Sequence, residues 1–557
     1  MRVLLVLMLA LGCGHASTAP LGRRAQPNPP PSRSGGDAAR QISEETHSLL
    51  RAEAELLWTR WTTGEGPLPA SALAAHPRLT QGDLIETVSA AAARSSGDDA
   101  RAFSLLAQQL ATLAISREAG KEIEALERAR AQLAFAAPGE ARATLGERDL
   151  DHLLRDEPGA GKRAAIALSE AKAAQPLAPL AIARDAAIDE SIVALGLGSW
   201  TAVEERAHGM PVAELERLAD ATLVATEQVG ARAVASAAVS NLGIPGDRVR
   251  RGDLPRLART SFADPQFTAG KAWPNVRDAL AQAGVAPPAS LRLDAEPSPS
   301  KGARPFALLV DPPDDVRLSL RPTGGFEEQR ATLHEGARAS GGALTSVSRW
   351  ELAQLGDGSA AEAVALLFEA LAGTPEWLRG ATELRGEPLD DLVHTEATRR
   401  MLSARRAAAM VLFEIRRRQG PRTAEAQATL YRGLVQRALF CVLSDEDAGR
   451  WALEADAFAR TASPLLGSIL AAQLERTFGP AWWKSNQPSI KQILSGGRSL
   501  TALEAASAAG LQRLDPAALA AVADERLRYS APDAPPPAPK PDYKYMQGDK
   551  KKRRKKR

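Results

Sequence analysis

Apolar residues recur at intervals of three and four along most of this chain, which is the spacing of one face of an α-helix. Pro and Gly separate successive runs. Between residues 41 and 528 the chain is rich in Ala, Leu, Glu and Arg and has few β-branched runs, so we predict a mainly α fold. A body of this length can bury a substantial core and can divide into two lobes. Representative amphipathic runs are residues 98–135, 211–235, 396–418 and 423–443.

One segment breaks the helical pattern. Residues 306–310 and 316–320 are short apolar or alternating runs, and residues 311–315 between them are rich in Asp and Pro. This arrangement predicts a β-hairpin with a turn-forming loop. The glycines at 324 and 325 then end the second strand, and a helix is expected to follow.

The helix expected after the hairpin contains the sequence Leu-His-Glu-Gly-Ala-Arg-Ala at residues 333–339. His334 and Glu335 match the start of the zinc-peptidase motif H-E-x-x-H, in which two histidines four apart bind zinc and the glutamate activates a water molecule. Arg338 stands where the second histidine is required. Further along, Glu362 lies in an apolar helical run, residues 361–371, which can place its carboxylate beside His334.

The order of strand, turn, His-Glu helix and Glu-bearing helix resembles the thimet oligopeptidase-like and carboxypeptidase Taq-like zinc metallopeptidases, the gluzincins. The resemblance is firmest over residues 300–380. It implies a large, mainly α fold with a small β-hairpin or sheet beside the active-site helix. It also implies that His334 is the first zinc ligand, Glu335 the general base and Glu362 the third ligand.

Arg338 argues against zinc chemistry, because a guanidinium stays protonated and offers no lone pair to a metal. The family usually carries tyrosine or histidine on a late helix, and residues 459–468, the corresponding segment, contain neither. We therefore expect a pseudoenzyme without zinc, in which Glu335, His334 and Glu362 are vestigial and Arg338 pairs with Glu335 or Glu362. The alternative is an active zinc peptidase that recruits a substitute ligand, for which His394 is the nearest candidate.

The first residues are typical of a bacterial export signal. An apolar run at residues 3–11 precedes Gly12 and Cys13, and this order resembles the lipobox of bacterial lipoproteins. We predict a signal peptide at 1–12, lipidation of Cys13 and a Pro/Gly/Ser-rich tether at 13–40. An ordinary secretory signal cut after Ala19 is the alternative. Gly14 favours the outer membrane, so the expected location is the bacterial cell envelope, through an acyl anchor.

The C-terminal residues 529–557 form a predicted disordered, Pro-rich and basic tail. Residues 540–557 carry a net charge of +8, and the whole chain carries +3, so the remainder sums to −5. After export such a run can bind anionic lipid or an acidic envelope polymer without sequence preference, whereas a specific nucleic-acid partner is not expected. A solvated tail with no partner is the other interpretation. The basic run consists of Lys550, Lys551, Lys552, Arg553, Arg554, Lys555, Lys556 and Arg557.

The sequence thus predicts an exported lipoprotein with a metallopeptidase-like domain at 41–528 that has lost catalysis and retains a peptide or protein ligand. A structural envelope protein tethered by its basic tail remains a further alternative. Cys441 is interpreted as a small core residue, and the cluster at 416–418 as a solvated helix face.

Overall fold

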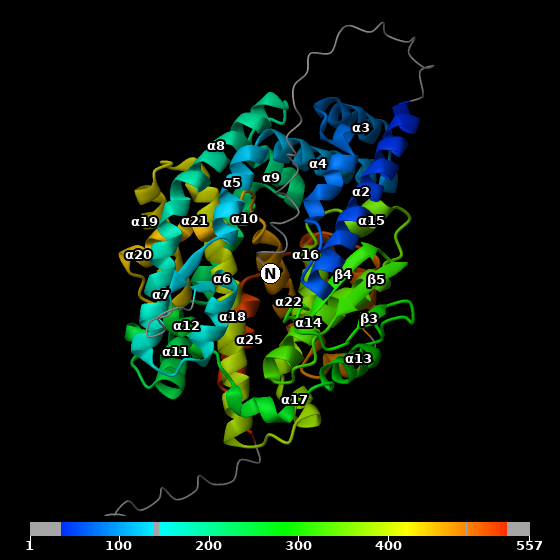
Figure 1. The fold of residues 1–557 in the computed structure, drawn as a ribbon. Coiled ribbons are helices and arrows are strands. Elements are labelled where there is room, and N and C mark those ends of the chain that lie inside the picture. The colour runs from blue at the N-terminus through cyan, green and yellow to red at the C-terminus, as the bar shows by residue number, and fades with distance from the viewer. Residues whose placement is uncertain (1–34, 137–143, 486, 532–557) are drawn as a thin grey trace, which may run out of the picture.

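The computed structural model describes residues 35–136, 144–485 and 487–531 (Figure 1). It confirms a mainly helical fold with a small sheet. The α-helices are α2 (Gly35–Thr63), α3 (Gly82–Arg94), α4 (Gly97–Glu118), α5 (Gly120–Ala131), α6 (Glu147–Asp156), α7 (Ala160–Ala174), α8 (Ala178–Ala194), α9 (Trp200–His208), α10 (Val212–Ala225), α11 (Glu227–Ala237), α12 (Leu254–Leu257), α13 (Ala272–Gln282), α14 (Phe326–Ala343), α15 (Trp350–Gln354), α16 (Ser359–Glu369), α17 (Pro375–Ala381), α18 (Glu387–Gln419), α19 (Ala424–Leu439), α20 (Asp445–Gly449), α21 (Trp451–Glu454), α22 (Ala462–Phe478), α23 (Pro488–Ser495), α24 (Ala502–Ala508) and α25 (Ala517–Leu527).

Short 3₁₀ turns connect many of these helices, and one π-helical turn, η4 (Ala238–Leu242), follows α11. The 3₁₀ turns are η1 (Pro69–Ala75), η2 (Pro77–Thr80), η3 (Gln175–Leu177), η5 (Gly246–Arg248), η6 (Arg251–Asp253), η7 (Ser261–Gln266), η8 (Ala370–Gly373) and η9 (Trp482–Lys484).

The predicted hairpin is confirmed as β4 (Phe306–Asp311) and β5 (Asp315–Ser319), which pair antiparallel. A third strand, β3 (Arg292–Asp294), runs parallel to β5, so the sheet order is β3-β5-β4 and β4 is an edge strand. A separate antiparallel pair, β1 (Ala134–Ala136) and β2 (Thr144–Gly146), lies earlier in the chain. Neither β3 nor this pair was predicted.

The amphipathic runs are helical, with corrections at their ends. The run at 98–135 is two helices, α4 and α5, separated at Ala119, and its last residues belong to β1. The run at 211–235 is likewise divided between α10 and α11, whereas the run at 396–418 lies entirely within α18. Periodicity predicts which face is buried better than it predicts a break of one residue between successive helices.

The ends of the body differ from the predicted boundaries. Residues 35–40, assigned to the tether, form the first turns of α2, and Ala39 there is fully buried. At the other end, residues 529–531 pack against the body, because Arg379 Nη2 donates to Tyr529 Oη at 2.7 Å and the Ala531 N–H donates to Asp390 Oδ1 at 2.8 Å. Cys13, the rest of the tether and the basic run at 550–557 lie outside the described residues.

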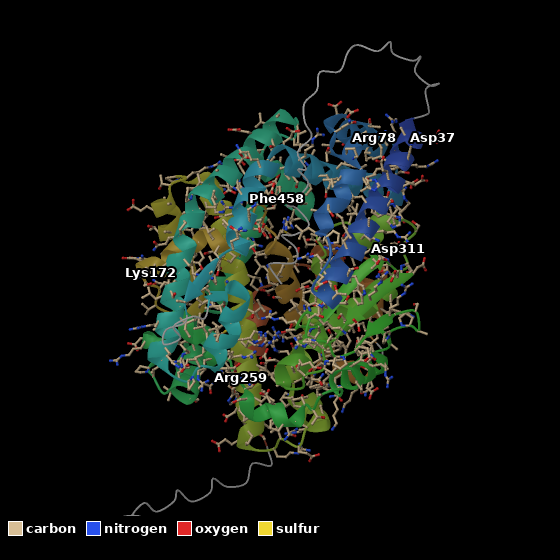
Figure 2. All side chains as sticks on the ribbon, viewed as in Figure 1. Asp37, Arg78, Lys172, Arg259, Asp311 and Phe458 are labelled. Atoms are coloured by element: carbon tan, nitrogen blue, oxygen red, sulfur yellow. The ribbon has the colours of Figure 1, made fainter. Side chains whose placement is uncertain are left out.

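Helix α2 covers the edge of the sheet. Its apolar residues Ala54 and Leu57 pack against Leu308 and Val310 of β4. At the turn of the hairpin, Asp311, which Figure 2 labels, lies 3.0 Å from His47 Nε2 of α2. The first helix of the described chain is therefore attached to the sheet by both apolar and polar contacts.

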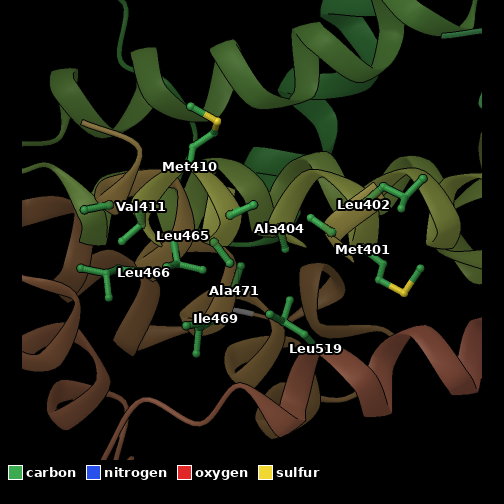
Figure 3. Packing of buried hydrophobic residues seen from close by; sticks show 14 of the residues in the cluster. Met401, Leu402, Ala404, Met410, Val411, Leu465, Leu466, Ile469, Ala471 and Leu519 are labelled. Carbon is green, nitrogen blue, oxygen red and sulfur yellow. The ribbon is translucent and has the colours of Figure 1, made fainter. Parts of the chain in front are cut away.

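The core is centred on α18 and α22. Figure 3 shows Val411 of α18 on the side of α22 that carries Leu465 and Leu466, whereas Met410 points to the opposite side of α18, and all of these side chains and Leu519 of α25 belong to one buried cluster. These side chains are almost completely buried. Their close packing fixes the helices that flank α14 and α16, and so fixes the position of the His-Glu segment. Within the described part of the chain, no helix is both long enough and apolar enough to cross a membrane.

Candidate functional site

Helix α14 carries the His-Glu segment and is buried on nearly every side. Its Ala339 and Ala343 pack against Val316 and Leu318 of the sheet, and α13 and α16 cover other faces. Small residues at these positions let the backbones approach closely. The sheet beside this helix was predicted, and Figure 1 shows β4 and β5 next to α14.

The structure brings His334, Glu335 and Glu362 together. His334 Nδ1 lies 3.1 Å from Glu335 Oε1, and His334 Nε2 lies 3.3 Å from Glu362 Oε1 on α16. Room for Glu362 comes from Gly467 of α22, where an added Cβ would lie 3.0 Å from Glu362 Cγ. The expected proximity of Glu362 to His334 is therefore observed, while the roles assigned to these residues remain predictions.

Arg338 lies one turn along α14 and contacts Glu335. Its Nη1 is 3.2 Å from Glu335 Oε1 and 3.3 Å from Oε2. The Oε2 atom also accepts the backbone N–H of Ala307 in β4 at 2.9 Å. The Arg338 side chain is 22% exposed and that of Glu335 is 9% exposed, so this is a largely buried ion pair. Of the two partners expected for Arg338, the structure selects Glu335.

These contacts set the protonation of the site. Burial opposes ionisation of Glu335, but the charge of Arg338 and the contact with His334 outweigh it and lower the pKa of Glu335 to about 2. Burial would lower the pKa of His334, yet the charge of Glu362 and the contact with Glu335 raise it to about 10. Glu335 is thus a stable anion and a poor general base, because proton uptake is most effective near the working pH.

This group of side chains does not fit a catalytic zinc ion. Zinc in such sites takes three protein ligands and a water molecule. Here both ring nitrogens of His334 face carboxylates. The position of the second histidine holds the guanidinium of Arg338, a hydrogen-bond donor that repels cations. Over the described ranges, no three His, Cys, Asp or Glu side chains are grouped as ligands of one metal ion. We therefore derive no step through zinc.

The substitute ligand considered from the sequence, His394, is engaged in another contact. It lies on α18, and its Nε2 is 2.9 Å from the backbone oxygen of Tyr529. The segment at 459–468 does lie near the site, because Ser463 Oγ donates to the backbone oxygen of Asp357, just before α16, at 2.6 Å.

A second buried histidine was missed by the sequence analysis. His208 Nε2 lies 3.3 Å from Glu204 Oε2, and its Nδ1 lies 3.8 Å from Asp357 Oδ2. Burial would lower the pKa of His208, but Asp357 and Glu204 outweigh it and raise the pKa to about 9. The available signal was the spacing of four between Glu204 and His208 on an amphipathic helix.

Arg498 was also missed, because it lies in a loop between α23 and α24. Its guanidinium lies against the turn before α16, where a Cβ on Gly358 would be 3.1 Å from Arg498 Nη2. Its Nε atom is buried and has no hydrogen-bond partner among the described residues. The positive charge of Arg338 and burial both lower the pKa of Arg498. Two guanidiniums therefore share the surroundings of Glu362.

The interpretation of residues 416–418 as a solvated face is wrong for Arg417 and Arg418, whereas the side chain of Arg416 is 38% exposed. The side chains of Arg417 and Arg418 are 2% and 4% exposed, and both bind Asp185 of α8. Arg184 binds the same carboxylate at 2.8 Å. Burial opposes ionisation of Asp185, but these three guanidiniums outweigh it and hold the pKa of Asp185 well below its usual value.

Cys441 is buried and unpaired in the described chain, as expected of a small core residue. Burial raises the pKa of its thiol to about 12, which makes it a weak nucleophile.

The chain matches no known protein-family model. A search of curated proteins likewise found no significant relative.

Proposed function

We propose that this chain is a non-catalytic, zinc-peptidase-like lipoprotein of the bacterial cell envelope that acts by binding a peptide or protein segment. The observation that carries the proposal is the buried pair between Arg338 and Glu335. The guanidinium of Arg338 takes the place of the second histidine and binds Glu335, the side chain that would activate water. The positive charge that zinc would supply to this site is therefore supplied by a side chain of the protein itself.

The other contacts of Glu335 support the loss of catalysis. Its Oε2 accepts the Ala307 N–H, and its pKa is lowered, so neither oxygen is free to take a proton from water near neutral pH. His334 and Glu362 retain the proximity that a metal centre would need. This combination is what we expect of a site that lost its second ligand and kept its fold.

The envelope part of the proposal rests on the sequence around Cys13 and on the basic run at 550–557. Replacing Cys13 by serine is expected to move the protein from the membrane fraction to the soluble fraction. Deleting residues 550–557 with Cys13 intact is expected to leave it in the membrane fraction. If the deletion releases the protein from the membrane fraction and the Cys13 variant stays there, a structural protein held by its basic tail is favoured.

The decisive experiment measures zinc and peptidase activity together. The wild-type protein, purified without chelators, is expected to contain no stoichiometric zinc and to leave a quenched fluorescent peptide library uncleaved. Arg338→His is expected to gain zinc affinity, because it supplies the third ligand beside His334 and Glu362. Arg277→His, on the exposed face of α13, is the matched control and should not gain zinc affinity.

About one zinc per wild-type chain, together with cleavage, would overturn the proposal and support the alternative of an active peptidase with an unusual ligand. Failure of Arg338→His to bind zinc any better than Arg277→His would count against the vestigial-site interpretation.

A further inference from the structure

A small cavity lies among α18, α22, α25 and η8, lined by side chains other than His334, Glu335 and Glu362. Its volume is about 30 Å³, which is enough for one or two water molecules or for a carboxylate group. Gly373 of η8 lets this turn approach α18, because an added Cβ would lie 3.0 Å from Glu396 Cβ. The lining residues are Ala370, Gly373, Glu396, Ala397, Arg399, Arg400, Met401, Ala472, Glu475, Leu519, Val522, Ala523 and Arg526.

One carboxylate in this cavity is shared by two arginines. Glu475 Oε1 accepts from Arg526 Nη2 at 3.0 Å, and Glu475 Oε2 accepts from Arg400 Nη1. Burial opposes ionisation of Glu475, but the charges of Arg400 and Arg526 outweigh it and lower its pKa. Arg526 Nη1 also lies 4.0 Å from Glu376 Oε2, so Glu475 is the acid that Arg400 and Arg526 share, and Glu376 is a second, more distant partner of Arg526.

The second terminal nitrogen of Arg400, Nη2, is buried and finds no acceptor among the residues that the structure describes. A buried donor of a charged group that lacks an acceptor is costly, so the position calls for one. An anionic acceptor would make a charge-assisted hydrogen bond with this nitrogen, which is stronger than the bond made by a neutral acceptor.

The neighbouring acid does not supply that acceptor. Glu396 Oε2 accepts from Arg399 Nε at 2.9 Å, and Glu396 Oε1 has no partner within the described chain. Burial raises the pKa of Glu396 in spite of the nearby arginines.

The remaining walls of the cavity are apolar. Met401 of α18 and Leu519 of α25, which Figure 3 labels, both line it. Val522 of α25 completes this wall. The three side chains are between 2% and 7% exposed. A ligand here needs a short apolar part next to its polar end.

We propose that this cavity is a carboxylate-binding site, in which a small organic carboxylate accepts from Arg400 Nη2 while its aliphatic part lies against Met401, Leu519 and Val522. The carboxylate belongs either to a free short-chain acid or to the C-terminus of a peptide. The site does not depend on the chemistry proposed for Glu335 and Arg338.

The test is isothermal titration calorimetry of the purified full-length protein with two matched pairs of probes. Butyrate is compared with butyramide, and acetyl-dialanine with its C-terminal amide. The acids are expected to bind and the amides are not. Arg400→Met is expected to weaken binding of the acid by about tenfold or more, because it removes a charge-assisted hydrogen bond.

Two further variants keep the test sharp. Arg416→Met, on the same helix, removes an arginine that is 38% exposed and pairs with Glu216, and it should bind the acids like the wild type. Ala523→Leu fills the cavity and leaves every lining charge in place, so it should also abolish binding. This variant decides the question if Arg400→Met does not fold.

Binding of butyrate alone, or of the peptide acid alone, supports the site and identifies the source of the carboxylate. Three results would each overturn the proposal. The acid and its amide bind equally well, or Arg400→Met and Ala523→Leu both bind with wild-type affinity, or neither acid binds at millimolar concentration. The cavity would then hold only water. Neither result changes the zinc experiment above, which tests a different group of residues.

Discussion

The ion pair between Arg338 and Glu335 makes an asymmetric prediction about stability. Arg338→Met leaves Glu335, with a side chain only 9% exposed, without its cationic partner. Breaking one side of a buried pair costs about 3–5 kcal/mol. Glu335 keeps the Ala307 N–H and the contact with His334, so we expect a smaller loss of unfolding free energy, about 2–3 kcal/mol.

The reverse substitution should cost less. Glu335→Gln retains an amide oxygen for the Ala307 N–H, and the Arg338 side chain, at 22% exposure, can turn toward water. We expect a loss of about 1 kcal/mol. The double variant should lie close to Glu335→Gln, because no unpaired anion is left buried, and the coupling energy is then about 2–3 kcal/mol.

The assay is equilibrium urea unfolding at pH 7, followed by circular dichroism, for the wild type and the three variants. Arg277→Met, on the exposed face of α13, controls for the loss of an arginine. A cost below about 0.5 kcal/mol for Arg338→Met, or simple additivity in the double variant, would refute the argument that the guanidinium neutralises Glu335.

Two other predictions concern buried titratable groups. Burial raises the pKa of Glu53 in α2 from 4.5 to about 8, so the stability that its protonated form provides is complete below about pH 4.5 and is lost as the pH rises toward 8. Glu53→Gln should therefore raise the unfolding free energy at pH 7 by about 3 kcal/mol, because pH 7 lies about 2.5 units above 4.5 and each unit corresponds to about 1.4 kcal/mol. The variant should show no gain at pH 4, and equal gains at both pH values would contradict this prediction. The pKa of His208 is raised from 6.5 to about 9, so its contribution is complete below about pH 6.5 and disappears as the pH passes 9. His208→Gln should therefore be less stable than the wild type by up to about 3 kcal/mol below pH 6.5, and this difference should disappear above pH 9. Urea unfolding measures both proteins across this range, and a constant difference between them at every pH would count against this role of His208.

The sequence predicted the elements whose signals are local. Helix α18 followed from an uninterrupted amphipathic run, and the β4–β5 hairpin from two apolar strands around a Pro-rich turn. Strand β3 was not predictable, because three residues that pair with a strand more than twenty positions away leave no periodic signal. The helix break at Ala119 was not predictable either, because alanine is a strong helix former and gives no signal that a helix ends.

The candidate site divides in the same way. His334, Glu335 and Arg338 lie on one helix and Glu362 on a helix nearby in sequence, so spacing alone could place them together. The partners of Arg417 and Arg498 come from distant segments. A charged residue in a sequence is predicted to be exposed to solvent, because most charged side chains are. Only the tertiary fold shows that Arg417 is neutralised by Asp185, 232 residues away.

The edge strand β4 limits how this protein can recognise anything. A peptide often binds by adding a strand to an exposed sheet edge, where main-chain groups supply affinity for almost any sequence. On β4, the Ala307 N–H is taken by Glu335, the Val310 oxygen accepts from Gln354 Nε2 at 3.2 Å, and α2 packs along the strand. Strand addition here would have to displace all three. The same contacts protect this edge of the sheet from pairing with another copy of the chain.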